Sequence, residues 1–356
     1  MPLFMDLHKA SDYDVKPTVE DIKRNHIADL AIQHKYGVKF LQYWINEEDG
    51  LVFCLMEGPD KESCIAVHQE AHGGMPCNVI ELKGGDYTAF IGDEVKANTF
   101  DIVENADGTF DTGYRVVLLI DQISLTAGDQ VTESIQHIIK NSGGRQVSRP
   151  GHRQMIVFTS AHAAIDCALK ILEAVQHAKI PAAEIRIGIS AGEPVTDEQD
   201  FFGSCIQLAN RLCDIAQDRH VVVSSLVKQL AGEMAFKNKQ TALVKILGRD
   251  DEQFLHQLIE AVSARFYQPA FSIDDLATHL NMSRSALYRK ITSLTGLSAN
   301  AFIREIRLQK ALQLIREKYG NVNEVALEAG FGNPSYFTRS FQKRFGIAPG
   351  QALRSA

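Results

Sequence analysis

The feature that most constrains this chain is a punctuated helical pattern that occurs twice near its C-terminal end. In each copy a small alanine is followed four residues later by Asn281 or Gly330. Asparagine and glycine are the residue types that best tolerate the left-handed backbone of a tight turn. Ser283 and Asn333 then stand where a new helix begins, and both are favourable N-cap residues. The sequence therefore predicts two helix-turn-helix units.

A long helix is expected between the two units, because Ser298 can cap it and apolar residues recur at helical spacing as far as Gly320. These apolar positions are Phe302, Ile306, Leu308, Ala311, Leu312 and Ile315. About 19 residues of helix span roughly 28 Å. A rigid spacer of that length could place the recognition helices about 34 Å apart, one turn of B-DNA, so that both enter successive major grooves.

Residues 252 to 356 resemble an AraC/XylS-type DNA-binding domain. The resemblance implies an all-α domain that binds double-stranded DNA in a sequence-specific way. Leu353 replaces the aromatic residue that usually precedes the terminal arginine, here Arg354, and this departure leaves the expected fold unchanged. The residues that carry the resemblance are Ala277, Ser283, Leu287, Gly296, Arg307, Ala311, Gly330, Phe331, Tyr336, Phe337, Phe341, Phe345, Gly346 and Pro349.

The charge distribution agrees with a DNA-binding C-terminal segment. Residues 251 to 356 contain 13 Lys and Arg against nine Asp and Glu, whereas the whole chain has a net charge of −7. A local basic excess favours contact with phosphates, and the acidic remainder limits indiscriminate binding to nucleic acid. The side chains expected to face the DNA groove are Arg284, Ser285, Tyr288 and Arg289 in the first unit, and Ser335, Tyr336, Arg339 and Lys343 in the second.

The middle segment, 115 to 247, alternates buried strands with helices and predicts an α/β sandwich with one sheet. Strands are expected at 116–121, 155–158 and 185–189, and helices at 131–141 and 161–177. The segment resembles a class III nucleotidyl cyclase domain. The residues that carry this resemblance are Asp121, Gly143, Gly144, Arg145, Gly151, Phe158, Ile187, Gly188, Ile189, Gly192, Glu193, Phe202, Gly203, Leu208, Ala209, Asn210, Arg211 and Leu212.

The departures from the cyclase pattern fall on the residues that would do the chemistry. Such cyclases hold two metal ions with a pair of aspartates, and the ions neutralise charge at the reacting phosphates. Asp121 matches the first aspartate, but His152 replaces the second, and neutral imidazole is a poor ligand for magnesium. Gln207 replaces the asparagine that orients the ribose, while Arg211 is kept. We therefore expect a vestigial site without enzyme activity, and Asp121 as an ordinary strand-end carboxylate.

The N-terminal segment, residues 1 to 82, has the strand and helix order β-α-β-β-α-β. This order predicts a ferredoxin-like sheet with both helices on one face. The segment resembles a small family of ferredoxin-like proteins known for nickel binding. The resemblance rests on the stretches 5–8, 26–30, 53–59 and 67–73, whose sequences are MDLH, HIADL, FCLMEGP and VHQEAHG.

A histidine cluster in this segment predicts a metal site. His68 and His72 stand four residues apart on one helical face, and His8 ends the first strand. His26 and Glu57 are further candidate ligands. Imidazole suits nickel, zinc or copper, and nickel or zinc is the expected ion. Because imidazole must be neutral to coordinate, affinity is expected to fall as the pH drops through about 6.5.

Composition and linkers set the remaining boundaries. Residues 83 to 114 are poor in apolar repeats and are interpreted as a connector that carries at most a short strand or helix. A second boundary lies near residues 248 to 251. No stretch approaches the roughly 20 apolar residues of a membrane span, so a cytoplasmic protein is expected. The six cysteines form no close-spaced framework, which is typical of reduced thiols.

Together these features favour a multidomain α+β transcription regulator whose C-terminal domain reads DNA. The N-terminal and middle domains are expected to sense a ligand or metal, to dimerise, or both. The expected partners are double-stranded DNA, a second copy of the chain and RNA polymerase. Two alternatives stay open. The histidine cluster favours a metal sensor or storage protein. The other alternative is an active cyclase fused to a DNA-binding domain, which the residues His152 and Gln207 disfavour.

Overall fold

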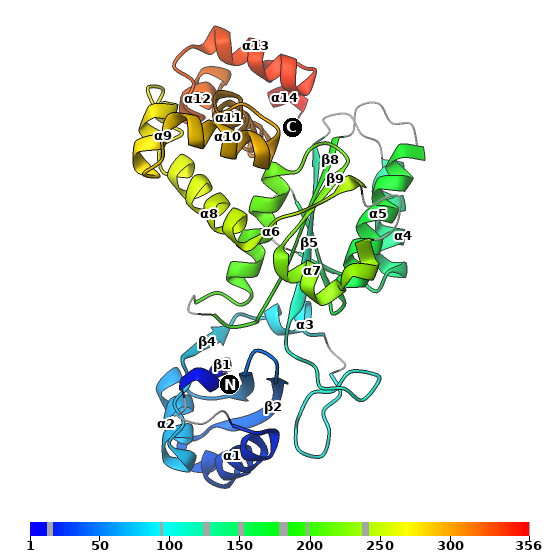
Figure 1. Ribbon diagram of the computed structural model, residues 1–356, viewed down its shortest axis with the longest axis vertical. Coiled ribbons are helices and arrows are strands. Elements are labelled where there is room, and N and C mark those ends of the chain that lie inside the picture. The colour runs from blue at the N-terminus through cyan, green and yellow to red at the C-terminus, as the bar shows by residue number, and fades with distance from the viewer. Residues whose placement is uncertain are drawn as a thin grey trace.

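Three parts of the chain follow one another along the long axis of the structure, which is a computed structural model (Figure 1). It describes residues 1–12, 17–92, 95–123, 129–148, 153–177, 184–196, 199–236 and 242–355. The N-terminal part and the C-terminal helices lie at opposite ends, with the middle part between them (Figure 1). Among the described residues, no helix has both the length and the apolar character needed to cross a membrane.

The N-terminal part is a four-stranded antiparallel sheet with two helices, in the predicted order. The strands lie in the order β2-β3-β1-β4 across the sheet. Alternation along each strand sends one set of side chains toward the helices and the other set to the opposite face. The elements are β1 (Leu3–Lys9), α1 (Val19–Ile32), β2 (Lys39–Asn46), β3 (Leu51–Glu57), α2 (Lys61–His72) and β4 (Asn78–Leu82).

Residues that the sequence assigns to a connector pack against this sheet. The segment contains α3 (Asp86–Phe90), and its later residues run beside the edge strand β2. The amide of Tyr43 donates to the carbonyl of Asp101 at 3.0 Å, and the amide of Val103 donates to the carbonyl of Tyr43 at 2.9 Å. Ile102 is fully buried in the core beneath α1 and α2. The described part of this connector is therefore attached to the N-terminal domain.

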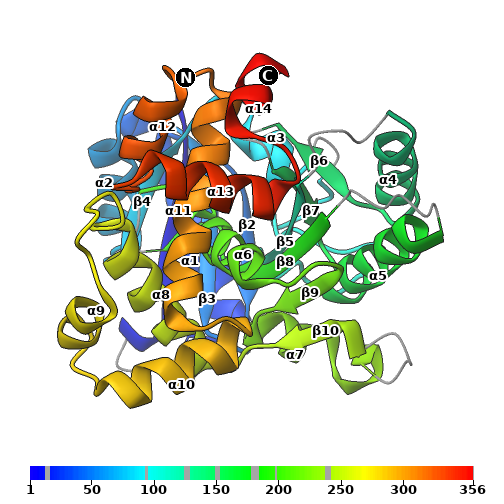
Figure 2. The same ribbon diagram turned by 90° about the horizontal axis from the view of Figure 1, so that it is seen from above.

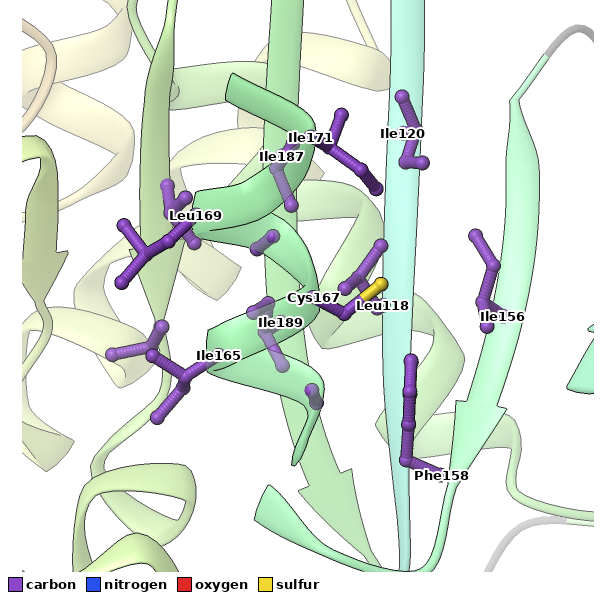
Figure 3. Packing of buried hydrophobic residues seen from close by; sticks show 14 of the residues in the cluster. Leu118, Ile120, Ile156, Phe158, Ile165, Cys167, Leu169, Ile171, Ile187 and Ile189 are labelled. Carbon is purple, nitrogen blue, oxygen red and sulfur yellow. The ribbon is translucent and has the colours of Figure 1, made fainter. Parts of the chain in front are cut away.

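The middle part is a six-stranded mixed sheet in the order β10-β9-β8-β5-β7-β6. Helices α4, α5 and α7 cover one face, where isoleucine, leucine and phenylalanine side chains of the strands meet those of α5 (Figure 3). Helix α6 lies on the other face. The elements are β5 (Arg115–Ile123), α4 (Asp129–Asn141), β6 (Arg145–Val147), β7 (Gln154–Phe158), α5 (Ala161–His177), β8 (Glu184–Gly192), α6 (Gly203–Ile215), β9 (His220–Val223), α7 (Ser225–Ala231) and β10 (Val244–Ile246).

The first two parts share one hydrophobic core. The sheet face that α1 and α2 leave open contributes Met5, Trp44 and Phe53, and the middle sheet contributes Val117 and Val157 to the same cluster. All five side chains are at most 1% exposed. Aromatic rings of α3 and the start of α6 complete the cluster, with the Phe90 and Phe202 rings stacked at 5.0 Å. Burial of this much apolar surface joins the two parts firmly.

The C-terminal part is all helical and contributes to two hydrophobic cores, of which the first also includes Leu212, Ile215 and Val222 of the middle part. Asn281 and Gly330 adopt left-handed backbone with φ of 51° and 79°, as predicted. The spacer α11 ends at Arg316, before the predicted stop at Gly320, because Lys318 already turns left-handed with φ of 55°. The helices are α8 (Arg249–Ser263), α9 (Ile273–His279), α10 (Arg284–Thr295), α11 (Ala299–Arg316), α12 (Val322–Glu328), α13 (Pro334–Phe345) and α14 (Pro349–Ser355).

Candidate DNA-binding surface and metal centre

The two predicted recognition helices are α10 and α13. The Ser283 hydroxyl accepts a hydrogen bond from the Ala286 amide at 3.2 Å, and the Asn333 side chain accepts one from the Tyr336 amide at 2.9 Å. Leu287 and Phe337 are fully buried at matching positions, which fixes the face that each helix turns to the core. Helix α10 lies at one end of the spacer α11, and α13 crosses α11 nearer its middle (Figure 2). This arrangement leaves one face of each helix to solvent.

The predicted base-reading side chains lie on those solvent faces. All eight are exposed: Arg284, Ser285, Tyr288, Arg289, Ser335, Tyr336, Arg339 and Lys343. Tyr288 and Tyr336 are 40% and 45% exposed, so their rings are available for contact. Arg284 pairs with Asp274 at 3.3 Å, and Arg339 donates to the Ser335 carbonyl at 3.4 Å. The structure therefore presents two similar polar surfaces.

The metal candidates come together under α1 and α2. Asp6 and His8 are two residues apart on β1, so both side chains lie on the face of the strand that is turned toward the helices. His68 and His72 project from α2 toward them. Ligand atoms of Asp6, His8, His68 and the β3 residue Cys54 all lie within 4.8 Å of one another. A second group of the same compactness joins Asp29, on α1, to His68 and His72. These six residues are called the histidine–aspartate cluster below.

His68 stands at the centre of the histidine–aspartate cluster. Its Nε2 lies 2.8 Å from Asp6 Oδ2, and its Nδ1 lies 3.1 Å from Asp29 Oδ2. The other oxygen of Asp6 accepts the Cys54 amide at 2.9 Å, and His72 Nε2 lies 3.3 Å from Asp29 Oδ1. His68 and Asp6 are 1% and 0% exposed. A single imidazole therefore bridges two buried carboxylates.

The charge state of the cluster follows from this bridge. Burial alone would lower the pKa of His68, but hydrogen bonds to Asp29 and Asp6 and the charges of both carboxylates raise it to about 10. Burial would raise the pKa of Asp6, yet His8 and His68 hold it well below its usual range. Burial and the neighbouring carboxylates raise the pKa of the Cys54 thiol. At neutral pH the cluster is thus a buried imidazolium with two carboxylates and a neutral thiol.

The structure brings together three of the five predicted ligands, His8, His68 and His72. His26 lies nearby, and its Nε2 is 3.2 Å from Asp101 Oδ2. Glu57 is at the wrong end of β3: it pairs with Leu3, whereas His8 pairs with Val52. An antiparallel register therefore carries Glu57 away from the cluster.

Three members of the cluster were not predicted: Asp6, Asp29 and Cys54. Asp6 could have been found, because it precedes His8 by two residues and so shares its face of the strand. Asp29 follows the candidate ligand His26 by three residues on one helix, whereas Cys54 carries no such local signal, since only the packing of β3 brings it close.

The predicted cyclase-like site contains an internal cation. Asp121 is fully buried, and the Arg153 guanidinium lies 3.3 Å from its carboxylate and 2.5 Å from that of Asp214. Arg153 also donates to the Asn210 side chain at 2.9 Å. The arginine thus neutralises the carboxylate that would hold a metal ion. His152 lies outside the described residues.

The arginine retained from the cyclase pattern is also engaged. Arg211 donates to Gln207 at 3.3 Å and pairs with Glu260 of α8 at 3.2 Å. A guanidinium held by an ion pair is less available to a nucleotide phosphate.

Comparison with known proteins assigns each part of the chain to a family pattern. Residues 276–355 match a helix-turn-helix domain, residues 4–82 a nickel responsive SCO4226-like protein, and residues 126–260 an adenylate and guanylate cyclase catalytic domain. The three resemblances inferred from the sequence are therefore confirmed. The cyclase match begins after β5 and so does not include Asp121.

Individual relatives match single parts of the chain. HTH-type transcriptional regulator MtrA of Neisseria gonorrhoeae is 34% identical over 115 residues, which are 32% of this chain and 38% of the relative. A segment of histidine kinase P4 of Formosa agariphila is 35% identical over 101 residues, 28% of this chain and 7% of the relative. The crystal structure of SCO4226 from Streptomyces coelicolor is 32% identical, with a TM-score of 0.21, and its match covers 22% of this chain and 94% of that one. The chain thus spans less than half the length of MtrA and less than half the length of histidine kinase P4.

Proposed function

We propose that this protein, with a helix-turn-helix domain matched at its C-terminus, is a sequence-specific DNA-binding transcription regulator. The observation that carries the proposal is the pair of exposed polar surfaces on α10 and α13, joined by one 18-residue helix. Arg289 and Arg339 stand at equivalent positions, six residues after their N-caps. An arginine on a recognition helix commonly binds guanine through two hydrogen bonds.

Removing these arginines tests the base-reading assignment. Arg289→Ala and Arg339→Ala are each expected to weaken binding to a DNA sequence selected from a random pool by roughly 1–3 kcal/mol, and to relax preference at one base pair. Fluorescence anisotropy with the selected sequence and its single-base variants measures both effects. Arg249→Ala, an exposed arginine at the start of α8, is the matched control. A uniform loss on all sequences would assign the arginines to phosphates instead.

A second proposed function is metal sensing by the N-terminal domain. The donor set suits a transition metal, because imidazole and thiolate are ligands that nickel and zinc accept. His8, His68 and Cys54, with Asp6, would hold the ion, and Asp29 and His72 form the second candidate group. A bound ion would supply positive charge in place of the His68 proton. It would alter DNA affinity only if the DNA-bound and free states bind it differently.

The charge state of His68 changes the pH dependence expected for metal binding. Because the pKa of His68 is raised to about 10, a metal ion must displace a proton from His68 at every pH near neutrality. The sequence alone predicted such competition only below about pH 6.5. Apparent nickel affinity of the full-length protein is therefore expected to rise about tenfold per pH unit between pH 6 and 8.5 for each displaced proton. Calorimetry in buffers of different ionisation enthalpy counts those protons. An affinity that levels off above pH 7 would contradict this placement of the metal at His68.

For the middle domain we propose a non-catalytic role. With Arg153 beside Asp121 and Arg211 paired with Glu260, incubation with ATP or GTP and manganese is expected to give no cyclic nucleotide. Mass spectrometry of the products measures this, and Arg153→Ala is expected not to restore activity. Cyclic nucleotide formation that Asp121→Ala abolishes would overturn the assignment.

The proposal includes partners and location. A regulator of this kind acts on double-stranded DNA as a homodimer, contacts RNA polymerase and works in the cytoplasm of a bacterium. Size-exclusion chromatography with light scattering tests the homodimer.

A further inference from the structure

The N-terminal domain contains a cavity of about 160 Å³ between α1 and the sheet. Five of the six residues of the histidine–aspartate cluster line it, all except Asp6, and the rest of its wall is formed by other residues. Val19, Ile22 and Ile45 give it an apolar side. An apolar protein cavity of about 150 Å³ is large enough to take benzene. The space therefore suits an organic molecule of about one ring.

Two residues of the cavity wall that lie outside the cluster each carry a buried polar atom. Among the described residues, neither His26 Nδ1 nor the Tyr43 hydroxyl has a hydrogen-bond partner. His26 and Tyr43 are 5% and 1% exposed, and their rings lie 4.5 Å apart. Buried polar groups without partners are rare and costly, so their presence in one cavity indicates a ligand that satisfies both.

The two atoms also specify the polar end of that ligand. His26 Nε2 lies 3.2 Å from Asp101 Oδ2, and in the tautomer that donates from Nε2 the Nδ1 atom is an acceptor. Burial raises the pKa of Tyr43, so its hydroxyl stays protonated and can donate. One hydroxyl group on a ligand can donate to His26 and accept from Tyr43 at the same time.

We infer that the cavity beside the histidine–aspartate cluster binds a small apolar molecule that carries one hydroxyl group, of about the size of phenol. This binding site shares part of its wall with the proposed metal centre, and it does not depend on DNA binding. The hydroxyl meets His26 and Tyr43, while the apolar body lies against Val19, Ile22 and Ile45.

Calorimetric titration of the full-length protein in EDTA with phenol tests this site. Anisole, whose methyl ether cannot donate a hydrogen bond, is expected to bind roughly threefold to tenfold more weakly, and Tyr43→Phe to weaken phenol by a similar factor. Ile22→Phe places a larger side chain in the cavity wall and is expected to abolish binding, with an unchanged circular dichroism spectrum as the folding control.

Absence of phenol binding to the wild-type protein overturns the site. Equal binding of phenol and anisole, or undiminished binding by Tyr43→Phe, overturns the assigned hydroxyl class. Binding retained by folded Ile22→Phe places the ligand elsewhere. Because EDTA removes metal ions, none of these outcomes depends on whether the cluster binds nickel.

A separate observation concerns the other end of the molecule, where α13 meets the middle domain. The Arg344 guanidinium, in the last turn of α13, binds the Glu184 carboxylate of β8 with two hydrogen bonds of 2.6 and 2.9 Å. Arg344 also donates to Glu305 of α11 at 2.9 Å, and Arg186 of β8 pairs with Glu305 at 2.9 Å and with Glu184 at 2.6 Å. All four side chains are at most 21% exposed. These four residues form an ionic clamp between the two domains.

The ionic clamp holds the base-reading face of α13 toward the middle domain. Tyr336, Arg339 and Lys343, which are exposed, line an open cavity of about 790 Å³ that Glu184 and Asp218 of the middle domain also line. A duplex with a major groove about 12 Å wide and two flanking backbones is far larger than this space. The middle domain and DNA therefore compete for one face of α13.

We propose that the ionic clamp is an autoinhibitory contact, a proposal that rests on the proposed DNA-binding function. Glu184 takes the position of a DNA phosphate opposite basic side chains, and full engagement of α13 with DNA requires the clamp to open. Glu184 lies outside the DNA-binding surface, so its substitution separates the clamp from direct DNA contact.

The test compares full-length Glu184→Gln with Glu173→Gln, an exposed residue of α5 that gives the same change in net charge. In anisotropy titrations with the selected DNA, Glu184→Gln is expected to bind roughly 5- to 100-fold more tightly than Glu173→Gln. Hydrogen exchange of residues 334–345 without DNA is expected to increase in Glu184→Gln only.

Equal or weaker DNA binding by Glu184→Gln overturns autoinhibition. If neither protein binds any selected sequence, the DNA-binding function fails. The exchange measurement then still decides whether the clamp forms, because unchanged exchange in Glu184→Gln would contradict it.

Discussion

Replacing His68 with alanine is expected to destabilise the N-terminal domain by roughly 3–5 kcal/mol, because it leaves Asp6 and Asp29 buried without their shared counter-charge. His68 lies 2.8 Å from Asp6 and 3.1 Å from Asp29, and it is 1% exposed, so solvent cannot compensate for its loss. Urea unfolding of the full-length protein at pH 7, followed by the fluorescence of Trp44, measures the change. Trp44 is the single tryptophan and is buried in the core that the first two domains share.

The matched control is His34→Ala, since His34 is an exposed histidine of the same domain. A loss below about 1 kcal/mol for His68→Ala, similar to that expected for a surface substitution, would show that the two carboxylates are not held by His68.

The wild-type protein supplies a second check on the same bridge. The His68 pKa is raised from 6.5 to about 10, so its contribution to stability is complete below pH 6.5 and is lost as the pH rises toward 10. The difference between wild type and His68→Ala should therefore shrink between pH 7 and 10.

Replacing Gly330 with alanine is expected to destabilise the second helix-turn-helix unit by roughly 2–5 kcal/mol. The left-handed conformation, with φ of 79°, costs an alanine about 1–2 kcal/mol. In addition, a Cβ at this position would lie 2.0 Å from the backbone carbonyl oxygen of Phe266, so the turn or the Phe266 loop must move, at a further cost of roughly 1–3 kcal/mol. Thermal unfolding and binding to the selected DNA both report the change.

Gly346→Ala separates the two causes. Gly346 ends α13 with φ of 78°, almost the same as Gly330, but a Cβ there meets no other atom within 4 Å. Its substitution is expected to cost only the conformational part. Equal destabilisation by both variants would mean that the approach of Phe266 to the turn contributes nothing.

Local patterns were sufficient to predict most elements of the fold. The strand Gln154–Phe158, the helix Ala161–His177 and the turns at Asn281 and Gly330 depend on neighbouring residues: a short apolar run, helical spacing and left-handed propensity. The end of α11 was predicted too late, because a glycine is a stronger stop signal than the left-handed Lys318 that ends the helix first.

Contacts between distant segments could not be predicted in the same way. His68 and His72 were found by their spacing on one helix, but Asp29 joins them only through the packing of α1 on α2. Glu57 was misplaced because the register of β1 and β3 is not readable from either strand alone. Likewise, nothing near Arg153 in the sequence indicates that its partners are Asp121 and Asp214.

The core shared by the first two sheets constrains how this chain could have been assembled from ancestral genes. A recombination point near residue 82 would leave Met5, Trp44 and Phe53 without the middle-domain side chains that cover them. The exposed apolar face would favour aggregation of either fragment. A chimaera that exchanges the N-terminal domain of this chain alone would therefore have to redesign the facing surface of the cyclase-like sheet.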